Sequence, residues 1–501
     1  MKTWLSSAGV AVLACAAVSV EEAQSAPAGD LVDRLPGWDA ELPSRHWSGY
    51  LDIEGGKHLH YYFIEKHGGG EGAPTVLWQN GGPGCSSLDG LFYEHGPFRI
   101  NATNPSQLIP FEFAWSRLAN MLYLEAPVGV GFSYSDHHED YVVDDDSNAI
   151  DNLKAVQKFW TLFPEFADAD FFLTGESYSG IYTPTLAEAI MNADRAGEYH
   201  GAPLRGIAVG NGCTGTEIGT CGTPGQKEKF LSKFLRQTAI ISPKIKDRVA
   251  AECGDFSEQM PSPHGSCLEA LTEMHGAIGN VNLYDVYGEC HNSSSVAFKA
   301  PSGGLTSTTE ALRGSLEVSG GDMESNTPGT NSLGASLGLA PGPAACIDSR
   351  FASFYLTQDE VVKALHVKKP PFVWGVCTNQ LTKYTPTRPN LPRDTYPDLV
   401  EYLDRTIIYN GDWDACVPWT DNYDWTSNMG FKVVEDWHPW AYIAKDGLGH
   451  QVAGYSVRYE TPKNQKKFTF TTIRGGRHEV PETAPEQAFE LIKRLIGDEI
   501  F

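Results

Sequence analysis

Short apolar runs and stretches of helical periodicity alternate along most of this chain. Alternating apolar and polar residues between Trp47 and Glu65 predict hairpin strands. Compact apolar runs predict buried strands at 75–78, 121–124, 171–173, 205–209, 406–409 and 468–473. Apolar spacing predicts helices at 151–163, 180–193, 227–237, 243–252, 357–365 and 485–495. Strands and helices that alternate in this way are typical of an α/β fold, with a mostly parallel central sheet and helices on both faces.

This alternation is interrupted between residues 213 and 349, where cysteines and loop-rich sequence take over. We therefore predict a core built from 27–212 and 350–501, with 213–349 inserted as a large cap. Within the cap, 301–344 consists mainly of Gly, Ser, Thr, Pro and Ala. This composition predicts a disordered or excisable loop.

The N-terminus has the pattern of a secretory signal peptide over residues 1–20. Lys2 precedes an apolar run that is too short and wrongly flanked for a membrane-spanning helix. We expect cleavage after Ala17, after Ser19 or as late as about residue 26, and no membrane attachment afterwards. A bacterial lipoprotein signal around Cys15 is the alternative.

Charge and cysteine content narrow the class of protein. A formal net charge of −25 disfavours binding to nucleic acid or to anionic membranes. Of ten cysteines, nine remain once Cys15 is removed, and in an oxidising compartment these are expected to be paired with one left over. Sequons at Asn101 and Asn292 fit the same secretory route, to the outside or to a vacuole or lysosome. Because no His/Cys pair has zinc spacing, we expect no metal. We also expect no cofactor.

The stretch from 171 to 180 combines an apolar strand, a sharp turn and the start of a helix. Gly175 and Gly180 bracket Ser177 within it. This is the context of a nucleophile elbow, which holds a serine hydroxyl at the end of a strand beside helix N-terminal amides. A turn-forming serine is the structural alternative.

A serine nucleophile needs a base and a carboxylate that orients the base. Asp412 and His478 each follow a predicted strand downstream of Ser177, in the order found in the α/β-hydrolase fold. Loops at the carboxyl ends of parallel strands share one edge of the sheet, so the three side chains are expected to converge. The amides of Gly82 and Tyr178 are the expected oxyanion hole.

Several motifs together resemble the serine carboxypeptidases of the vacuolar, lysosomal and secreted type, from about Trp47 to the C-terminus. They are Trp78-Gln-Asn-Gly-Gly-Pro-Gly-Cys-Ser-Ser87, Gly175-Glu-Ser-Tyr-Ser-Gly180, Gly210-Asn-Gly212, Ala364-Leu-His366, Gly411-Asp412, Val452-Ala-Gly-Tyr455 and His478-Glu-Val-Pro481.

The resemblance implies a group that binds the terminal carboxylate of a peptide, made here by Asn80, Gly81, Glu94 and Glu176. A carboxyl group donates a hydrogen bond to a carboxylate only when it is protonated, so an acidic pH optimum is expected. Solvated or salt-bridged glutamates are the structural alternative.

The family pattern also suggests a Cys85–Cys377 disulfide. Three further pairs are expected in and beside the cap, and Cys416 is then the free thiol. These pairs are Cys213–Cys221, Cys253–Cys267 and Cys290–Cys346. The chain departs from the family at Gln79, Ser179, Trp413 and Arg477, and the cation at 477 leaves the pH profile open because it precedes His478.

The sequence thus predicts a serine carboxypeptidase that acts on the C-termini of peptides and proteins. An acyltransferase on the same scaffold and a non-catalytic binding protein are the alternatives, and Asn80 and Glu176 favour the peptidase. The sequence leaves monomer and homodimer equally open.

Overall fold

The computed structural model describes residues 26–254, 256, 262–279, 281–289, 350–369, 374–378, 380–499 and 501. Its centre is an 11-stranded mixed sheet, in which six neighbouring strands are parallel. Antiparallel pairs extend the sheet at both edges. In spatial order the main strands are β1 (His46–Ile53), β2 (Lys57–Ile64), β6 (Asn120–Leu124), β3 (Thr75–Gln79), β9 (Phe171–Glu176), β10 (Leu204–Gly210), β12 (Arg405–Gly411), β15 (Lys467–Ile473), β14 (Gly449–Glu460) and β13 (Lys432–Ala444).

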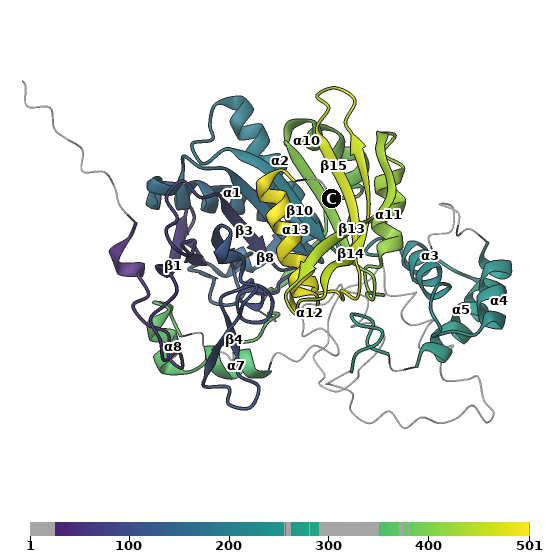
Figure 1. Ribbon diagram of the computed structural model, residues 1–501, viewed down its shortest axis with the longest axis horizontal. Coiled ribbons are helices and arrows are strands. Elements are labelled where there is room, and N and C mark those ends of the chain that lie inside the picture. The colour runs from purple at the N-terminus through teal and green to yellow at the C-terminus, as the bar shows by residue number, and fades with distance from the viewer. Residues whose placement is uncertain are drawn as a thin grey trace, which may run out of the picture.

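Both faces of the sheet are covered, as the sequence predicts (Figure 1). One face packs against α1 (Asp145–Leu162), α2 (Ser179–Ala196), α10 (Tyr396–Tyr402) and α11 (Trp419–Ser427). The other packs against α7 (Arg350–Leu356), α8 (Asp359–Ala364), α12 (Val480–Thr483) and α13 (Pro485–Gly497). The buried strands have no polar face because both sides lie against helices.

Small elements complete the core. Two short sheets pair β8 (Val142–Asp144) with β11 (Lys383–Thr385), and β4 (Phe98–Ile100) with β5 (Leu108–Pro110). The strand β7 (Tyr134–Ser135) adds to β2, and α9 (Leu391–Asp394) precedes α10.

Three helices lie beside the sheet and have a hydrophobic cluster of their own (Figure 1). They are α3 (Pro224–Leu235), α4 (Pro243–Cys253) and α5 (Gly265–Ile278). The cluster meets the core at Trp413, Ala415 and Trp419, which follow β12. The sequence predicts α3 and α4 but treats the stretch of α5 as loop, which is wrong.

Two other predictions of local structure need correction. The predicted helix at 357–365 is the shorter α8, and a separate helix, α7, precedes it. The helix predicted at 151–163 begins six residues earlier, at Asp145, because Asp144 and Ser147 form a capping box.

The register of the parallel strands sets their carboxyl ends at one edge. Gln79 pairs with Gly175, Glu176 with Gly210, and Gly411 with Ile473. The loops that follow β3, β9, β12 and β15 therefore begin side by side, as expected for a site in an α/β sheet.

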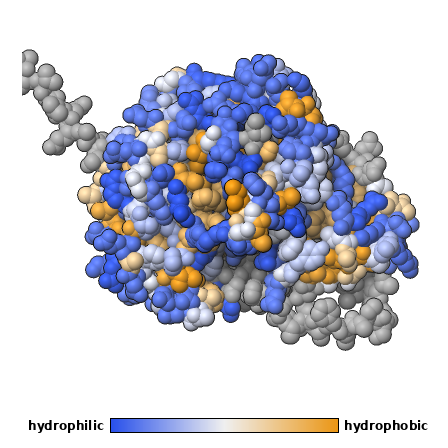
Figure 2. All heavy atoms as spheres, in the orientation of Figure 1, coloured by the Kyte–Doolittle hydropathy of each residue, from blue (hydrophilic) through white to orange (hydrophobic). Residues whose placement is uncertain are grey.

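The surface seen in Figure 2 is mostly hydrophilic, with separate hydrophobic patches. In the part of the chain that the structure describes, no helix is long and apolar enough to cross a membrane.

Candidate active site

Ser177 occupies the sharp turn between β9 and α2. Its backbone is left-handed, with φ of 60°, a conformation that non-glycine residues seldom adopt. The flanking glycines serve close packing instead: a Cβ at Gly175 would collide with Ser179, and one at Gly180 would collide with the backbone of Cys213. The strain therefore falls on the serine itself, which is the geometry of a nucleophile elbow.

His478 pairs with Asp414 and not with the predicted Asp412. Its Nδ1 lies 2.8 Å from Asp414 Oδ2, and both side chains are buried. The two oxygens of Asp414 also accept from Asn211 Nδ2 at 2.7 Å and from the amides of Cys416 and Val417 at 2.8 and 3.1 Å. Four donors thus hold Asp414 in a fixed orientation.

The prediction for Asp412 is wrong for a local reason. Asp412 directly follows the end of β12, and its Oδ1 accepts from Gly475 N at 2.7 Å. This hydrogen bond joins the loop after β12 to the loop after β15. Burial raises its pKa to about 6, although the Gly475 amide opposes this. The turn that follows brings Asp414, two residues later, under His478.

The position of His478 is set by the cap as well as by β15. Its amide donates to the carbonyl of Tyr284 at 3.0 Å, and the Tyr284 ring stands edge-on to the imidazole at 4.7 Å. Among the described residues, no group hydrogen-bonds its buried Nε2. A proton on Nδ1 directed at Asp414 leaves Nε2 as the basic nitrogen.

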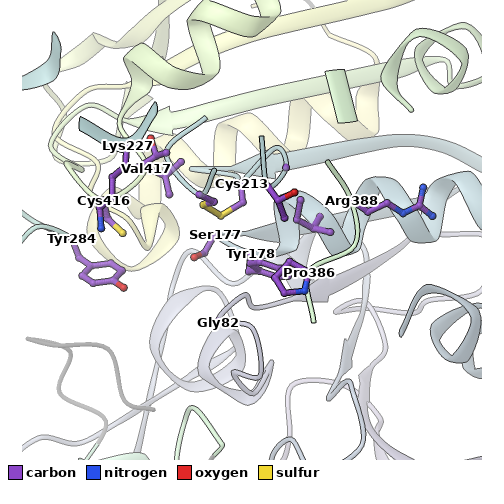
Figure 3. A pocket seen from close by; sticks show the side chains of 15 residues that line it. Gly82, Ser177, Tyr178, Cys213, Lys227, Tyr284, Pro386, Arg388, Cys416 and Val417 are labelled. Carbon is purple, nitrogen blue, oxygen red and sulfur yellow. A yellow bond between two sulfur atoms is a disulfide. The ribbon is translucent and has the colours of Figure 1, made fainter. Parts of the chain in front are cut away.

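The loop after β3 packs directly on the elbow. A Cβ at Gly81 would collide with the Tyr178 amide, and Gly82 has a φ of 113°. Gly82, Ser177 and Tyr178 line one pocket (Figure 3). The structure thus brings the predicted oxyanion donors and the predicted nucleophile together. The disulfide Cys85–Cys377 fixes the far end of this loop.

Asn80, Glu94 and Glu176 form one buried hydrogen-bonded group. Asn80 Nδ2 donates to Glu94 Oε1 at 2.9 Å and to Glu176 Oε1 at 3.1 Å. Trp78 Nε1 donates to Asn80 Oδ1 at 2.7 Å, which fixes the amide in this orientation. Asn80 and Glu176 are 96 positions apart in the sequence, and the pairing of β3 with β9 brings them together.

Both glutamates have pKa values well above the ordinary value. For Glu94 the main cause is burial, followed by the charge of Asp89. For Glu176 it is burial, followed by the charge of Glu94. Asp89, whose pKa burial raises to about 8, and Glu479 extend this group of carboxyls. Neither residue was predicted from the sequence, although Glu479 directly follows His478.

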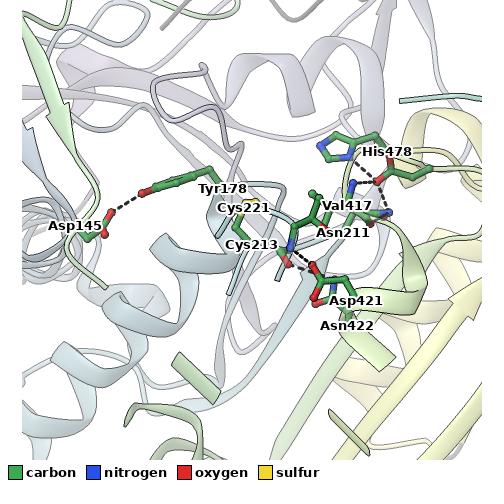
Figure 4. Close-up of a disulfide and its surroundings, with 12 residues drawn as sticks. Asp145, Tyr178, Asn211, Cys213, Cys221, Val417, Asp421, Asn422 and His478 are labelled. Atoms are coloured by element: carbon green, nitrogen blue, oxygen red, sulfur yellow. Dashed lines mark hydrogen bonds and ion pairs between the residues drawn. A yellow bond between two sulfur atoms is a disulfide. The ribbon is translucent and has the colours of Figure 1, made fainter. Parts of the chain in front are cut away.

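Asp145 is a further buried carboxylate that sequence reasoning missed. Its Oδ1 accepts from Tyr178 and Tyr384 hydroxyls at 2.9 and 2.8 Å, and its Oδ2 accepts from the amides of Thr387 and Arg388 at 2.6 and 3.0 Å. Figure 4 shows Tyr178 reaching Asp145, with Asn211 and His478 lying beyond the Cys213–Cys221 disulfide. Asp145 thus ties the pocket wall at 384–388 to the residue after Ser177.

Three of the predicted disulfides are confirmed: Cys85–Cys377, Cys213–Cys221 and Cys253–Cys267. Cys416 is a free thiol in the pocket wall. Cys290, Cys346, Asn292 and the loop 301–344 lie outside the described residues. The Asn101 side chain bonds Gln107 and Thr103 in a half-buried turn, and its glycosylation stays a prediction.

The four departures from the family pattern leave the site intact. Arg477 forms an ion pair with the buried Asp285 at 2.8 Å. The ring of Trp413 meets that of Tyr287 edge to face, and the Ser179 hydroxyl is hydrogen-bonded to the Thr183 hydroxyl within α2. Gln79 is buried at the end of β3.

The chain is similar to known proteins over most of its length. The family model described as serine carboxypeptidase matches residues 36–498. The chain belongs to the serine carboxypeptidase family. It is 34% identical to serine carboxypeptidase-like 20 of Arabidopsis thaliana over 492 residues, covering 94% of each chain. It is 31% identical to serine carboxypeptidase 1 of Hordeum vulgare over 489 residues, covering 94% of this chain and 93% of the relative.

A further relative supports this assignment, and a solved structure shares the fold. The lysosomal protective protein of Mus musculus is 31% identical over 495 residues, with 95% of each chain covered. A prohormone-processing carboxypeptidase from Saccharomyces cerevisiae shares the fold, with a TM-score of 0.63 at 19% identity, over 93% of this chain and 95% of that one. The predicted α/β-hydrolase fold is therefore confirmed.

Proposed function

We propose that this serine carboxypeptidase family member is an active serine-type carboxypeptidase that releases C-terminal residues from peptides and proteins at acidic pH. The observation that carries the proposal is the buried contact of Asn80 with Glu94 and Glu176, directly beside Ser177. Protonated glutamates and an amide N–H are donors, and a free peptide C-terminus presents a carboxylate that accepts them.

In the proposed reaction, Ser177 Oγ attacks the carbonyl carbon of the last peptide bond and His478 Nε2 takes its proton. Asp414 stabilises the imidazolium through Nδ1. The amides of Gly82 and Tyr178 donate to the oxygen that becomes negative. His478 then protonates the departing amine, which leaves as a free amino acid, and an acyl-enzyme remains. Water, deprotonated by His478, cleaves the ester and restores Ser177.

A secretory route, ending outside the cell or in a vacuole or lysosome, is part of the proposal. Its support is the set of three disulfides, which persist in oxidising compartments. An acidic compartment also suits a site that requires neutral carboxyl groups.

The test compares a blocked dipeptide with a free C-terminus against the same dipeptide amidated. We expect the wild type to hydrolyse the free acid much faster than the amide, and Ser177→Ala to hydrolyse neither. Hydrolysis of both at equal rates would contradict carboxylate recognition. Transfer of an acyl group to an added alcohol without peptide hydrolysis would favour an acyltransferase instead. Binding of the peptide without turnover would favour a non-catalytic protein.

A further inference from the structure

Residues 281–289 of the cap, which we call the strap, lie against the loop that carries Asp414. The Leu283 carbonyl accepts a hydrogen bond from the Ala415 amide at 2.8 Å, and the Val286 amide donates to the carbonyl of the residue before Asp414 at 3.2 Å. These two hydrogen bonds fall on either side of Asp414 in the sequence. The strap therefore holds the backbone of this carboxylate residue from both sides.

The strap also contacts His478 directly. The His478 amide donates to the Tyr284 carbonyl at 3.0 Å, and the Tyr284 ring meets the imidazole edge-on at 4.7 Å. The Tyr284 side chain lines the pocket beside Ser177, together with Cys416 (Figure 3). The strap thus touches the loops of the candidate base and of its carboxylate partner, and it forms part of the pocket wall.

By its packing, the strap belongs to the cap. It follows α5, and its apolar side chains pack in the hydrophobic cluster of the cap helices: Val281, Leu283 and Val286. Asn282 shapes its turn, since the Asn282 Oδ1 accepts from the Tyr284 amide at 3.0 Å. A segment packed on the cap can hold the base in a fixed place only if it is also fastened to the core.

An ion pair fastens the strap to the core. Arg477 Nε lies 2.8 Å from Asp285 Oδ2, and the Asp285 side chain is buried. The other oxygen, Oδ1, accepts from the Tyr287 amide at 3.2 Å within the strap. Burying a carboxylate is costly unless it is paired, so Asp285 favours the position in which it meets the guanidinium.

The core side of this ion pair is fixed by the backbone around Arg477. The Arg477 amide donates to Thr483 Oγ1 at 3.1 Å. A Cβ at Gly411, the last residue of β12, would collide with the Arg477 carbonyl, so the two loops pack closely there. Because Arg477 directly precedes His478, the ion pair acts on the backbone next to the candidate base.

We propose that Asp285 and Arg477 are positioning residues for the candidate base. Their ion pair holds the strap against the loops that carry Asp414 and His478. His478 is thereby kept in the orientation in which its Nε2 takes the proton of Ser177. This inference rests on the proposed function. Since Arg477 departs from the family pattern, the family resemblance does not supply this role.

Two variants break the ion pair in different ways. Asp285→Asn keeps the size of the side chain and an oxygen for the Tyr287 amide, but it turns an amide donor toward the Arg477 guanidinium. Arg477→Met keeps the length of the side chain without its charge. In each we expect kcat for a blocked dipeptide to fall by about 10–100-fold, since a misplacement of about 1 Å can cost about 10²-fold. KM should stay within about threefold, because the carboxylate-binding group is held by its own hydrogen bonds.

Two further variants test whether the two residues act as a unit. Arg477→Lys keeps the charge and should retain kcat within about fivefold of the wild type. The double variant Asp285→Asn/Arg477→Met should be about as active as the less active single variant, since the effects of residues in contact are not additive. A loss equal to the product of the two single losses would contradict a role for the pair.

Arg45→Met is the matched control. The Arg45–Glu65 ion pair has the same separation of 2.8 Å, and its side chains are 51% and 9% exposed, against 42% and 5% for Arg477 and Asp285. Glu65 directly follows β2, at the edge of the sheet opposite to the site. Arg45→Met also removes the partner of a buried carboxylate, yet it should keep kcat within about twofold because distant sites act independently.

All rates are measured at a temperature at which thermal unfolding shows every variant to be folded. An unchanged kcat in both Asp285→Asn and Arg477→Met would overturn the inference. A raised KM at normal kcat would also overturn it, because the strap would then shape the pocket alone. An equal loss of kcat in Arg45→Met would assign the effect to general destabilisation.

The rate at which a fluorophosphonate labels Ser177 separates the two proposals, because this reagent needs an activated serine and carries no terminal carboxylate. If the wild type hydrolyses no dipeptide but is labelled, and labelling is slower in Asp285→Asn and Arg477→Met, the proposed function fails and the positioning role stands. If dipeptides are hydrolysed and neither kcat nor labelling changes in these variants, the positioning role fails and the proposed function stands. If the wild type is neither labelled nor active, both are contradicted.

Discussion

The imidazole of His478 is hydrogen-bonded to Asp414 at 2.8 Å, although Asp412 is nearer in sequence to the end of β12. Asp414 is buried beneath the ring and held by Asn211 and two backbone amides, whereas Asp412 bonds Gly475. The two carboxylates therefore have different roles: one orients the candidate base and the other joins two loops.

Replacing these two residues by Asn gives a matched pair. Asp414→Asn should lower kcat by about 10³–10⁴-fold, because an amide can hold the wrong tautomer of the imidazole and cannot stabilise its cation. Asp412→Asn should change kcat by no more than about tenfold, because the Asp412 carboxylate bonds the Gly475 amide and His478 is paired with Asp414. Steady-state kinetics with a blocked dipeptide, alongside thermal unfolding, measure both. A larger loss in Asp412→Asn would contradict the assignment.

The sequence alone could not decide which of these two aspartates pairs with His478. The strands were predictable because both faces of the sheet are covered, so that β3, β6, β9 and β15 are apolar runs. The placement of Ser177 and His478 at the shared edge was predictable because each comes after such a run. Asp412 and Asp414 both follow β12 within three residues, and the choice depends on Asn211, which lies about 200 residues away. Only the folded chain makes that contact.

Elements without an apolar run were also missed. The hairpin of β13 and β14 forms the far edge of the sheet, and only Trp440 and Ala444 of β13 are buried. Its residues show no buried face that a pattern could identify. Asp145 was missed because its four partners come from Tyr178 and from residues 384–388, which the fold alone brings to the start of α1.

The pH dependence of substrate binding should follow the ionisation of Glu94 and Glu176. Their raised pKa values mean that both are neutral donors at acidic pH and become repulsive anions as the pH rises through those values. KM for a free-acid dipeptide should therefore increase as the pH rises through these raised pKa values, which lie well above the ordinary value for Glu of about 4.3. In the double variant Glu94→Gln/Glu176→Gln this increase should be much smaller, because amides remain neutral donors.

An ester without a terminal carboxylate serves as the control substrate for this measurement. Its KM should lack the same rise, since no carboxylate is present to be repelled. A parallel rise for ester and free acid in the wild type would assign the pH effect to another group.

The same two glutamates should make stability depend on pH. When folding raises the pKa of a carboxyl group, the stabilisation that this gives is fully present at pH values below the pKa in the unfolded chain. It is lost as the pH rises through the higher pKa of the folded protein. Between pH 5 and 8 the wild type should therefore lose more thermal stability than the double variant Glu94→Gln/Glu176→Gln. Unfolding followed by circular dichroism at several pH values measures the difference. Equal slopes for the two proteins would contradict a buried neutral pair.

Asp145 should matter for both stability and substrate turnover. Asp145→Ala leaves two tyrosine hydroxyls and two amides without their acceptor. We expect a loss on the order of 3 kcal/mol in the free energy of unfolding. Because Tyr178 and the wall at 384–388 are released, kcat/KM should also fall at temperatures where the variant is fully folded. Tyr178→Phe removes a single hydroxyl and should have a smaller effect on each quantity.

The most direct test of the central claim is the stepwise digestion of one peptide, followed by mass spectrometry at acidic pH. The peptide is prepared with a free and with an amidated C-terminus, and each form is incubated with the wild type and with Ser177→Ala. The account predicts successive loss of single residues from the C-terminus of the free acid by the wild type, and no loss in the other three reactions. Internal cleavage, equal trimming of the amidated peptide, or trimming by Ser177→Ala would contradict it.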